Sequence, residues 1–253
     1  MRFKIIVKGM PLFTFIKGMP AFLNDYKNIK RQAAFSKEDF AFGKLYPCLQ
    51  EENQQSGVLA EHYFYQDLHV ARKIFQNEPE KHVDVGSRVD GFVAHVASFR
   101  TIEVMDVRDL HIAIPSIRFT RADLSSADFS LTDYCDSLSC LHALEHFGLG
   151  RYGDRVNYEG HLLGWENFYK ILKKGGKFYF SVPIGEQRIE FNAHRVFSLA
   201  YLLKLIDKRY VIDSFAYIND EGDFIADATL EEQSVNNNFG CHYGCGIFEL
   251  TKL

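Results

Sequence analysis

From about residue 82 onward, the chain alternates short apolar, β-branched and aromatic runs with segments of helical periodicity. The runs typical of strands are residues 83–85, 102–105, 117–123, 134–141, 177–184, 210–218 and 245–253. The helical patterns between them are residues 92–99, 142–147 and 161–172, and KKGG before the fifth run reads as a helix end and a turn. Such alternation is typical of a mostly parallel sheet with helices on both faces. The pattern therefore predicts a doubly wound α/β fold.

The residues before this region carry a different pattern. Residues 24–35 are basic and helical in pattern, residues 49–57 are polar and typical of a loop, and residues 61–75 place apolar side chains at helical spacing. We expect residues 1–79 to form a helical N-terminal extension or lid, and residues 80–253 to form the main domain.

Composition and charge narrow the class of partner. The chain has 29 Lys and Arg against 33 Asp and Glu, without a basic stripe, so nucleic acid is not expected as a partner. Five cysteines without a framework spacing favour a reducing compartment, and we expect a cytoplasmic protein. The N-terminal apolar run, Gly9–Ile16, is too short to span a bilayer, which leaves a peripheral membrane contact open.

The stretch His82–Gly91, HVDVGSRVDG, reads as a buried strand that breaks into a glycine turn before a helix. Gly86 lets the backbone approach a ligand, and the helix start offers unpaired N–H groups. The next strand ends in Asp106, where open α/β sheets bind a ribose diol through a carboxylate. Asp109 and Glu103 are alternatives, and each of these acids could instead cap a helix.

Five motifs, VDVGSRVDG, EVMDV, RAD, DSLSCLHALEH and LKKGGKFYFSVP, resemble those of class I S-adenosylmethionine-dependent methyltransferases in the same order. This resemblance implies a Rossmann-like, seven-stranded sheet, mostly parallel with an antiparallel last strand, and S-adenosylmethionine as the cofactor.

A second set of motifs, YPCL, HYFYQDLHVARKI, HALEHFGLGRYGD and FNAHRVFS, is similar to methyltransferase-like proteins of bacterial surface or capsular polysaccharide synthesis. The implied acceptor is a small molecule, a glycan or a nucleotide-linked precursor. It would be methylated on a sugar hydroxyl or a phosphoramidate oxygen. The oligomeric state is not indicated.

The first resemblance implies a set of cofactor contacts. Asp84 and Gly86 would hold the amino-acid end of the cofactor, Asp106 the ribose, and Asp123 with its neighbours the adenine. The full set implied is Asp84, Gly86, Ser87, Arg88, Gly91, Asp106, Asp123, Cys140 and Leu141.

The turn departs from the family pattern at two positions, where Arg88 and Asp90 stand in place of glycines. The Arg88 side chain either narrows the approach or turns away to meet an anionic acceptor, and Gly91 could serve as the last glycine. A non-catalytic protein that keeps the fold to bind a partner is therefore an alternative.

Methyl transfer from a sulfonium is an in-line displacement, so alignment of the reactants is the main requirement. A hydroxyl acceptor also needs a base, for which His142 is the first candidate, Glu145 its neighbour and His194 the second candidate. On a helix, His142 and His146 would share a face. A packing role remains open for Glu145, His146 and His194. The residues expected near the acceptor are Tyr63, Gln66, Asp67, His146, Arg151, Tyr152, Asp154 and Arg195.

A metal enzyme is the main catalytic rival. His142 and His146 have helical ligand spacing, and Cys241, His242 and Cys245 lie close together in CHYGC. The sequence lacks a second CxxC pair and the HExxH signature, so we expect no metal. A nicotinamide-dependent enzyme would share the glycine turn and the ribose acid, but HALEH and the Gly-Gly strand favour a methyl donor.

Overall fold

The computed structural model describes residues 12–36, 42, 43, 45, 47, 49, 61–110 and 113–253. The chain divides into two compact units, residues 1–59 and residues 60–253. Helix α2 (Glu61–Asn77), which the sequence pattern grouped with the N-terminal extension, is part of the second unit. The loop predicted over residues 49–57 lies outside the described residues except for Leu49.

The first unit contains one long helix in its described part, α1 (Leu12–Ala33). It begins well before the predicted helix of residues 24–35 and includes Pro20. Near its end, the Tyr26 ring meets Phe42 edge-on at 5.8 Å between centroids, and the Lys30 ammonium lies over both rings. This small aromatic contact joins the helix to the residues that follow it.

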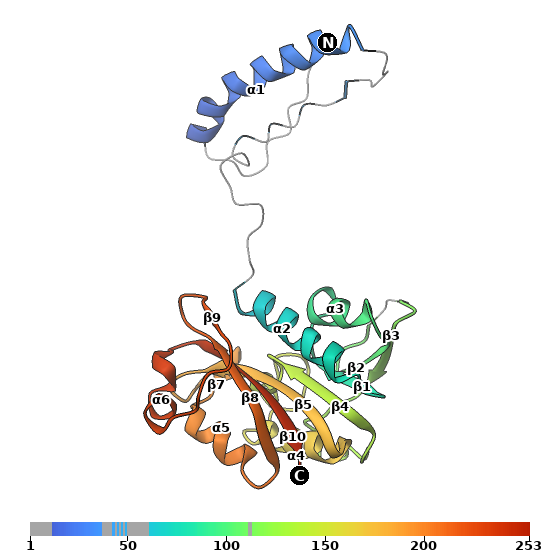
Figure 1. The fold of residues 1–253 in the computed structure, drawn as a ribbon, viewed down its shortest axis with the longest axis vertical. Helices are drawn as coiled ribbons and strands as arrows, with labels where there is room; N and C mark the ends of the chain where they lie inside the picture. Colours follow the sequence, from blue (N-terminus) through green and yellow to red (C-terminus); the bar gives the residue numbers. More distant parts are fainter. Residues whose placement is uncertain are drawn as a thin grey trace. The chain divides into compact units, whose positions relative to one another are not determined.

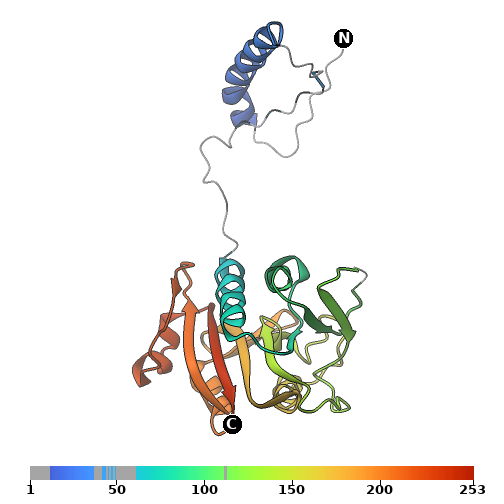
Figure 2. The same cartoon turned by 45° about the vertical axis from the view of Figure 1, so that its right-hand side comes forward.

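The second unit is built on a central sheet (Figures 1 and 2). In the described residues this sheet has eight strands in the order β3-β2-β1-β4-β5-β10-β8-β9. Its strands are β1 (His82–Val85), β2 (Ile102–Asp106), β3 (Ile117–Arg121), β4 (Cys135–Leu141), β5 (Leu172–Ile184), β8 (Tyr210–Ile218), β9 (Phe224–Ile225) and β10 (Gly244–Lys252). Strands β1 to β5 run parallel, and β10 lies antiparallel between β5 and β8. The mostly parallel α/β fold with an antiparallel last strand is thus confirmed.

Helices cover both faces of this sheet (Figure 1). One face packs on α2, on the π-helical turn η2 (Val89–Val93) and on α3 (Ala94–Ala97). The other face packs on α4 (Gly160–Ile171), α5 (Leu199–Ile206) and α6 (Glu232–Asn236). Strand β5 shows why both faces close: Phe178 and Phe180 point into the second layer and Tyr179 into the first, as the two-residue period of a strand requires.

The predicted count of seven strands was wrong, because the polar segment after β8 contributes the short strand β9. A separate hairpin, β6 (Arg188–Glu190) with β7 (His194–Val196), also forms where the sequence showed no strand pattern. These strands are too short to carry a periodic signal, and pairing with a neighbour defines them.

The predicted helix end and turn at KKGG were also wrong. Helix α4 ends at Ile171, and β5 begins directly at Leu172. Gly175 has φ +74°, and the register of β4 against β5 shifts between Cys135 and Ser137. The two glycines therefore form an irregularity inside a strand, where positive φ costs glycine little.

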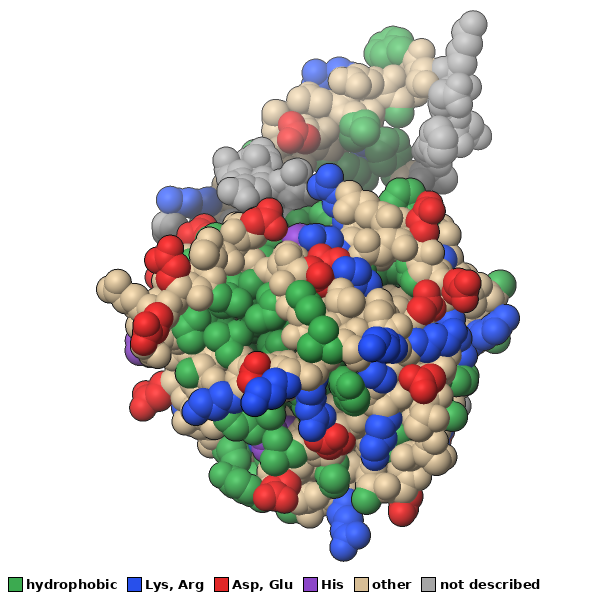
Figure 3. Space-filling view, turned by 60° about the horizontal axis from the view of Figure 1, so that its bottom comes forward, with side chains coloured by type: hydrophobic (Ala, Val, Ile, Leu, Met, Phe, Trp, Pro, Cys, Tyr) green, Lys and Arg blue, Asp and Glu red, His purple; other side chains and the backbone are tan. Residues whose placement is uncertain are grey.

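The surface of the second unit carries mixed charge on the face shown in Figure 3, where Lys and Arg side chains are interspersed with Asp and Glu. Among the described helices, none has both the length and the apolar character needed to cross a bilayer.

Candidate functional site

A pocket of about 420 Å³ lies at the carboxyl ends of β1, β2, β3 and β4. Its volume falls in the range of about 300–1,000 Å³ that is typical of small-molecule sites. The order of the strands reverses between β1 and β4, and open α/β sheets bind their ligands beside such a switch point. The pocket is therefore the candidate functional site.

The glycine turn after β1 forms one wall of the pocket. Gly86 has φ +76°, its N–H donates to the Met105 carbonyl at 3.0 Å, and a Cβ there would lie 2.9 Å from the Cβ of Ala143. Only glycine fits this turn without strain, because both the backbone angle and the space oppose a side chain. The turn brings backbone to the pocket in the way that the sequence predicted.

Asp84 supports this turn from beneath and does not line the pocket. Its fully buried carboxylate accepts hydrogen bonds from the backbone N–H and hydroxyl of Ser87, at 3.1 and 2.8 Å, and from the Ser139 hydroxyl at 2.5 Å. Burial raises the pKa of Asp84 to about 6, although these hydrogen bonds oppose the shift. Its position indicates that Asp84 fixes the shape of the turn.

Asp106 lies at the carboxyl end of β2 and lines the pocket, as expected for a ribose-binding acid. Its Oδ1 accepts from the backbone N–H and the Nε of Arg108, and its Oδ2 accepts from an Arg108 terminal nitrogen at 2.7 Å. A carboxylate offers about four acceptor positions, so Oδ2 keeps capacity for a hydroxyl. The Arg108 guanidinium also stacks on Tyr152, with 4.4 Å to the ring centroid.

The two side chains that stand in place of glycines in the turn form an ion pair with each other. Arg88 and Asp90 form a bidentate ion pair at 3.0 and 2.7 Å, with both side chains about 70% exposed. Arg88 lines the pocket without filling the turn. A Cβ on Gly91 would lie 2.7 Å from the Asp67 carboxylate, so Gly91 serves the packing of α2 against η2.

His142 and Glu145 form a buried pair at the end of β4. The predicted helix there was wrong: His142 has φ +51°, and helical structure is limited to a single 3₁₀ turn, η3 (Leu144–His146). His142 and His146 therefore share no helical face. Instead the His142 Nδ1 donates to the Glu145 Oε1 at 2.9 Å, with both side chains at least 96% buried.

The charges in this pair stabilise each other. Burial alone would lower the pKa of His142, but the Cys245 sulfur and the Glu145 carboxylate hold it well above its usual value. Burial alone would raise the pKa of Glu145, but the hydrogen bond from His142 holds it below its usual value. The bond at Nδ1 also fixes the ring, so that Nε2 is the nitrogen left for chemistry.

The side of the pocket near His142 has aromatic and basic walls. The Tyr63 ring lies 5.4 Å from the His142 ring, and the His146 ring meets Tyr152 edge-on at 5.2 Å. His146 Nδ1 and the Arg151 guanidinium both donate to the Ala193 carbonyl, at 2.7 and 2.9 Å. Burial lowers the pKa of His146, which keeps its ring neutral beside Arg151.

The loop that carries Arg151 and Tyr152 is closed at its base. Asp154 accepts from the backbone N–H groups of Gly148 at 2.8 Å and of Gly150 and Tyr152, each at 3.2 Å. The Gly148 carbonyl accepts from the Asn157 N–H at 2.9 Å, and Gly148 also packs against the first residue of α4. The carboxylate of Asp154 thus organises the loop in addition to lining the pocket.

Three residues assigned to the acceptor and one candidate base lie away from the pocket. Arg195 is 4% exposed and donates to the carbonyls of Phe147 and Tyr158, at 2.6 and 3.0 Å. His194 lies in β7 beside Glu190. Gln66 and Asp67 are buried in α2 and bond to each other, so they belong to the packing of this helix and do not reach the acceptor side.

Of the described residues, the structure gathers about half of the sequence-predicted set around the pocket. Those that line it are Tyr63, Gly86, Arg88, Asp106, Asp123, Leu141, His142, His146, Arg151, Tyr152 and Asp154. Those that do not are Gln66, Asp67, Asp84, Ser87, Gly91, Cys140, Glu145, His194 and Arg195. The sequence analysis missed two pocket residues, Arg108 and Ser125, which could have been found because each lies two positions after a predicted ligand acid. The hydroxyl and backbone N–H of Ser125 donate to the Asp123 carboxylate at 2.6 and 2.8 Å.

Comparisons with known proteins give one family and several solved structures. The family model that matches residues 93–240 is described as "Caenorhabditis protein of unknown function, DUF268". Comparison with curated protein sequences gives no match.

Among solved structures, the chain is similar to the N-methyltransferase NodS from Bradyrhizobium japonicum in complex with S-adenosyl-L-homocysteine, with a TM-score of 0.49, 10% identity, and coverage of 76% of this chain and 89% of that one. It is also similar to a TehB-like SAM-dependent methyltransferase from Corynebacterium glutamicum, with a TM-score of 0.48, 15% identity, and coverage of 92% and 100%. A third similar structure is the [4+2]-cyclase SpnF, with a TM-score of 0.48, 12% identity, and coverage of 68% and 75%.

Proposed function

The chain belongs to the family described as Caenorhabditis protein of unknown function, DUF268, and from its site we propose that it is an S-adenosylmethionine-dependent methyltransferase. The observation that carries this proposal is the pocket that the Gly86 turn and Asp106 line together at the carboxyl ends of β1 and β2. A close backbone approach beside a ribose-binding acid is the arrangement that a nucleoside cofactor needs.

The pocket residues fit the cofactor. Gly86 keeps one wall free of side-chain atoms, and Asp106 retains acceptor capacity for the ribose diol. Met105 and Leu124 supply apolar walls, and the Asp123 carboxylate is held in place by Ser125. S-adenosylmethionine supplies an activated methyl group on a sulfonium. The chain has to orient the acceptor in line and exclude water.

We propose an oxygen acceptor, with His142 as the residue that takes its proton. Glu145 holds the Nδ1 side of the ring, which leaves Nε2 as the nitrogen that can take the proton. Because the pKa of His142 is held well above its usual value, only the chains whose ring is neutral can act in this way, and their share grows as the pH rises. A phosphoryl or phosphoramidate oxygen is already anionic and needs positioning without a base. Arg151 and Arg108 line the pocket and offer the positive charge that an anionic acceptor would meet.

The resemblance to proteins of bacterial surface and capsular polysaccharide synthesis supports a sugar or phosphoramidate acceptor as part of this proposal, whereas the matching family model is described for Caenorhabditis. We place the activity in the cytoplasm. Four cysteines in the described segments, Cys135, Cys140, Cys241 and Cys245, are free thiols, which suits a reducing compartment.

The test is calorimetric titration of S-adenosylmethionine and S-adenosylhomocysteine into the wild type, Asp106→Asn and Asp109→Asn. Asp109 is a matched control because its carboxylate is half exposed, pairs with Arg121 and does not line the pocket. Hydrogen bonds to a charged group contribute about 1.5–3 kcal/mol each, so Asp106→Asn should weaken binding more than about tenfold.

We expect Asp109→Asn to bind like the wild type. If the folded wild-type chain bound neither compound, the proposal would be wrong. Equal binding by Asp106→Asn and the wild type would remove Asp106 from the cofactor site.

A further inference from the structure

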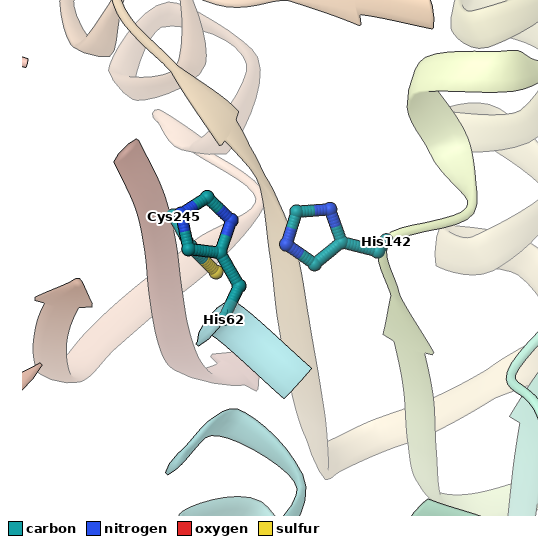
Figure 4. Close-up of side chains that lie close together, drawn as sticks. All are labelled: His62, His142 and Cys245. Carbon is teal, nitrogen blue, oxygen red and sulfur yellow. The ribbon is translucent and has the colours of Figure 1, made fainter. Parts of the chain in front are cut away.

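Three potential metal ligands from distant parts of the chain meet beside the pocket (Figure 4). His62 is in the first turn of α2, His142 follows β4, and Cys245 is the second residue of β10. One donor atom of each residue lies within 4.8 Å of the other two. The tertiary fold therefore builds this cluster, which the helical spacing of His142 with His146 did not predict.

The His142 ring is oriented toward this cluster. Its Nδ1 is held by Glu145, and Figure 4 shows a ring nitrogen on the opposite side pointing toward His62 and Cys245. Among the described residues, this buried Nε2 has no hydrogen-bond partner. Leaving a buried polar atom unpaired is unfavourable, so a ligand at Nε2 would stabilise the site.

The backbone at His142 is also unusual for this residue type. It has φ +51° and is fixed by a hydrogen bond from its N–H to the Ser181 carbonyl on β5 at 3.0 Å. A non-glycine residue in this region is strained, and such residues cluster at functional sites. The strained backbone aims the His142 ring at Cys245 and His62.

We propose that His62, His142 and Cys245 bind a zinc ion, with His142 coordinating through Nε2 and a fourth position left open. Two imidazoles and a thiolate are ligands that Zn²⁺ prefers, and three protein ligands with an open position are typical of catalytic zinc sites. Glu145 supplies the carboxylate that commonly fixes a zinc-bound histidine from its far side.

Small movements complete the site. Tetrahedral zinc, with bonds of about 2.0–2.3 Å, places its donor atoms roughly 3.4–3.6 Å apart. The three donor atoms lie within 4.8 Å of one another, so they need to close by about 1 Å. The His62 and His142 rings are stacked, with 5.5 Å between centroids and 16° between planes, so one ring also has to turn before both nitrogen lone pairs meet at one ion. His62 lies at the start of α2 and is only partly buried, which leaves its ring room to turn.

The position of this site gives the ion a role in the proposed transfer, although ion binding itself does not depend on that proposal. His142 lines the pocket, so the ion would sit at its wall. A hydroxyl on the open position would lose its proton to solvent more readily, because zinc lowers the pKa of oxygen that it binds. His142 would then act as a ligand, and the ion would replace it in activating a hydroxyl acceptor.

The test is titration of Co²⁺, a spectroscopic substitute for zinc, into the full chain after dialysis against a chelator. The wild type should bind equimolar Co²⁺ with a thiolate-to-cobalt charge-transfer band. Cys245→Ser should abolish this band. His62→Ala should weaken binding by more than about a hundredfold, since even outer partners of metal ligands contribute about 10–100-fold.

The controls are Cys241→Ser and His242→Ala, which alter the same CHYGC stretch outside the cluster and should leave the spectrum unchanged. Circular dichroism checks that each variant is folded. His62→Ala carries the test if Cys245→Ser does not fold, because His62 is only partly buried.

A wild-type chain that binds no Co²⁺ would overturn the proposal. Binding that His62→Ala and Cys245→Ser leave intact would also overturn it. Titration of S-adenosylhomocysteine into the metal-free chain is a separate readout, so failure of the zinc site and failure of the methyltransferase proposal can be told apart.

Discussion

The buried His82 ring at the start of β1 should make the stability of this chain depend on pH. His82 is 1% exposed, and its two ring nitrogens bond to the hydroxyls of Ser137 and Ser139, at 2.7 and 3.1 Å. Burial, with a smaller contribution from the charge of Arg100, lowers the pKa of His82 to about 3. The ring is therefore neutral in the folded chain at every pH near neutrality.

The sign and size of the effect follow from the difference between the folded and unfolded states. The unfolded His82 titrates near 6.5, so between pH 6.5 and about 3 the unfolded chain binds a proton that the folded chain does not. The stabilising contribution is present in full above pH 6.5 and is lost as the pH falls. From pH 7 to pH 5 the loss is about 2 kcal/mol, at 1.36 kcal/mol for each pH unit below 6.5.

Asp84 would obscure this loss in the wild type alone. Its raised pKa of about 6 contributes stability that is present at low pH and is lost as the pH rises toward 6. His82 and Asp84 both bond the Ser139 hydroxyl, so the variant chosen is His82→Gln, whose amide can still bond that hydroxyl and so keeps the contribution of Asp84 similar in the two proteins. Relative to the wild type, the free energy of unfolding of His82→Gln should rise by about 2 kcal/mol when the pH is lowered from 7 to 5, whatever the difference between the two proteins at pH 7.

The assay is urea unfolding of the wild type, His82→Gln and His95→Gln at pH 7 and pH 5. His95 is exposed on α3 and provides the control for replacing a histidine by glutamine outside the core. A change below about 0.5 kcal/mol for His82→Gln, or a change of opposite sign, would refute the reasoning.

Two further predictions concern the turn and the buried arginine. Gly86→Ala should lower the free energy of unfolding by about 1–3 kcal/mol and weaken S-adenosylhomocysteine binding, because φ is +76° and the new Cβ would meet Ala143. Urea unfolding measures the first effect and calorimetry the second. An unchanged affinity would contradict the close approach of this backbone to the ligand. Arg195→Ala should lower the free energy of unfolding by at least about 2 kcal/mol, because the carbonyls of Phe147 and Tyr158 lose a charged donor. A stable variant with impaired acceptor binding would instead favour the acceptor role expected from the sequence.

The strands and the acid at the end of β2 were predictable because their signals are local. Val83 and Val85 mark a buried strand in a few residues, and Asp106 follows the next strand at the expected distance. Gly86 was equally readable, since a turn at a strand end leaves few other choices of residue. What could be predicted from the sequence was the position of the pocket and about half of the residues expected in it.

The side of the pocket near His142 was less predictable because tertiary contacts decide it. HALEHF contains good helix formers, yet the hydrogen bond of His142 to Ser181 on β5 holds its backbone at positive φ and reduces the helix to one turn. Arg195 was expected at the acceptor because it stands beside His194, but backbone carbonyls of the neighbouring loop accept its hydrogen bonds. Cys245 was flagged within CHYGC, and only the pairing of β10 with β5 brings it to His142 and His62.

The closed base of the loop that begins at Gly148 has a consequence for how this family could diversify. The loop enters and leaves at one point, where Gly148 contacts both Asn157 and Gly160, while Arg151 and Tyr152 extend from it into the pocket. Insertions or replacements between these glycines leave the sheet and α4 where they are. Sequence changes confined to this surface loop can therefore alter the pocket wall that Arg151 and Tyr152 form. The wall at the ends of β1 and β2 stays unchanged.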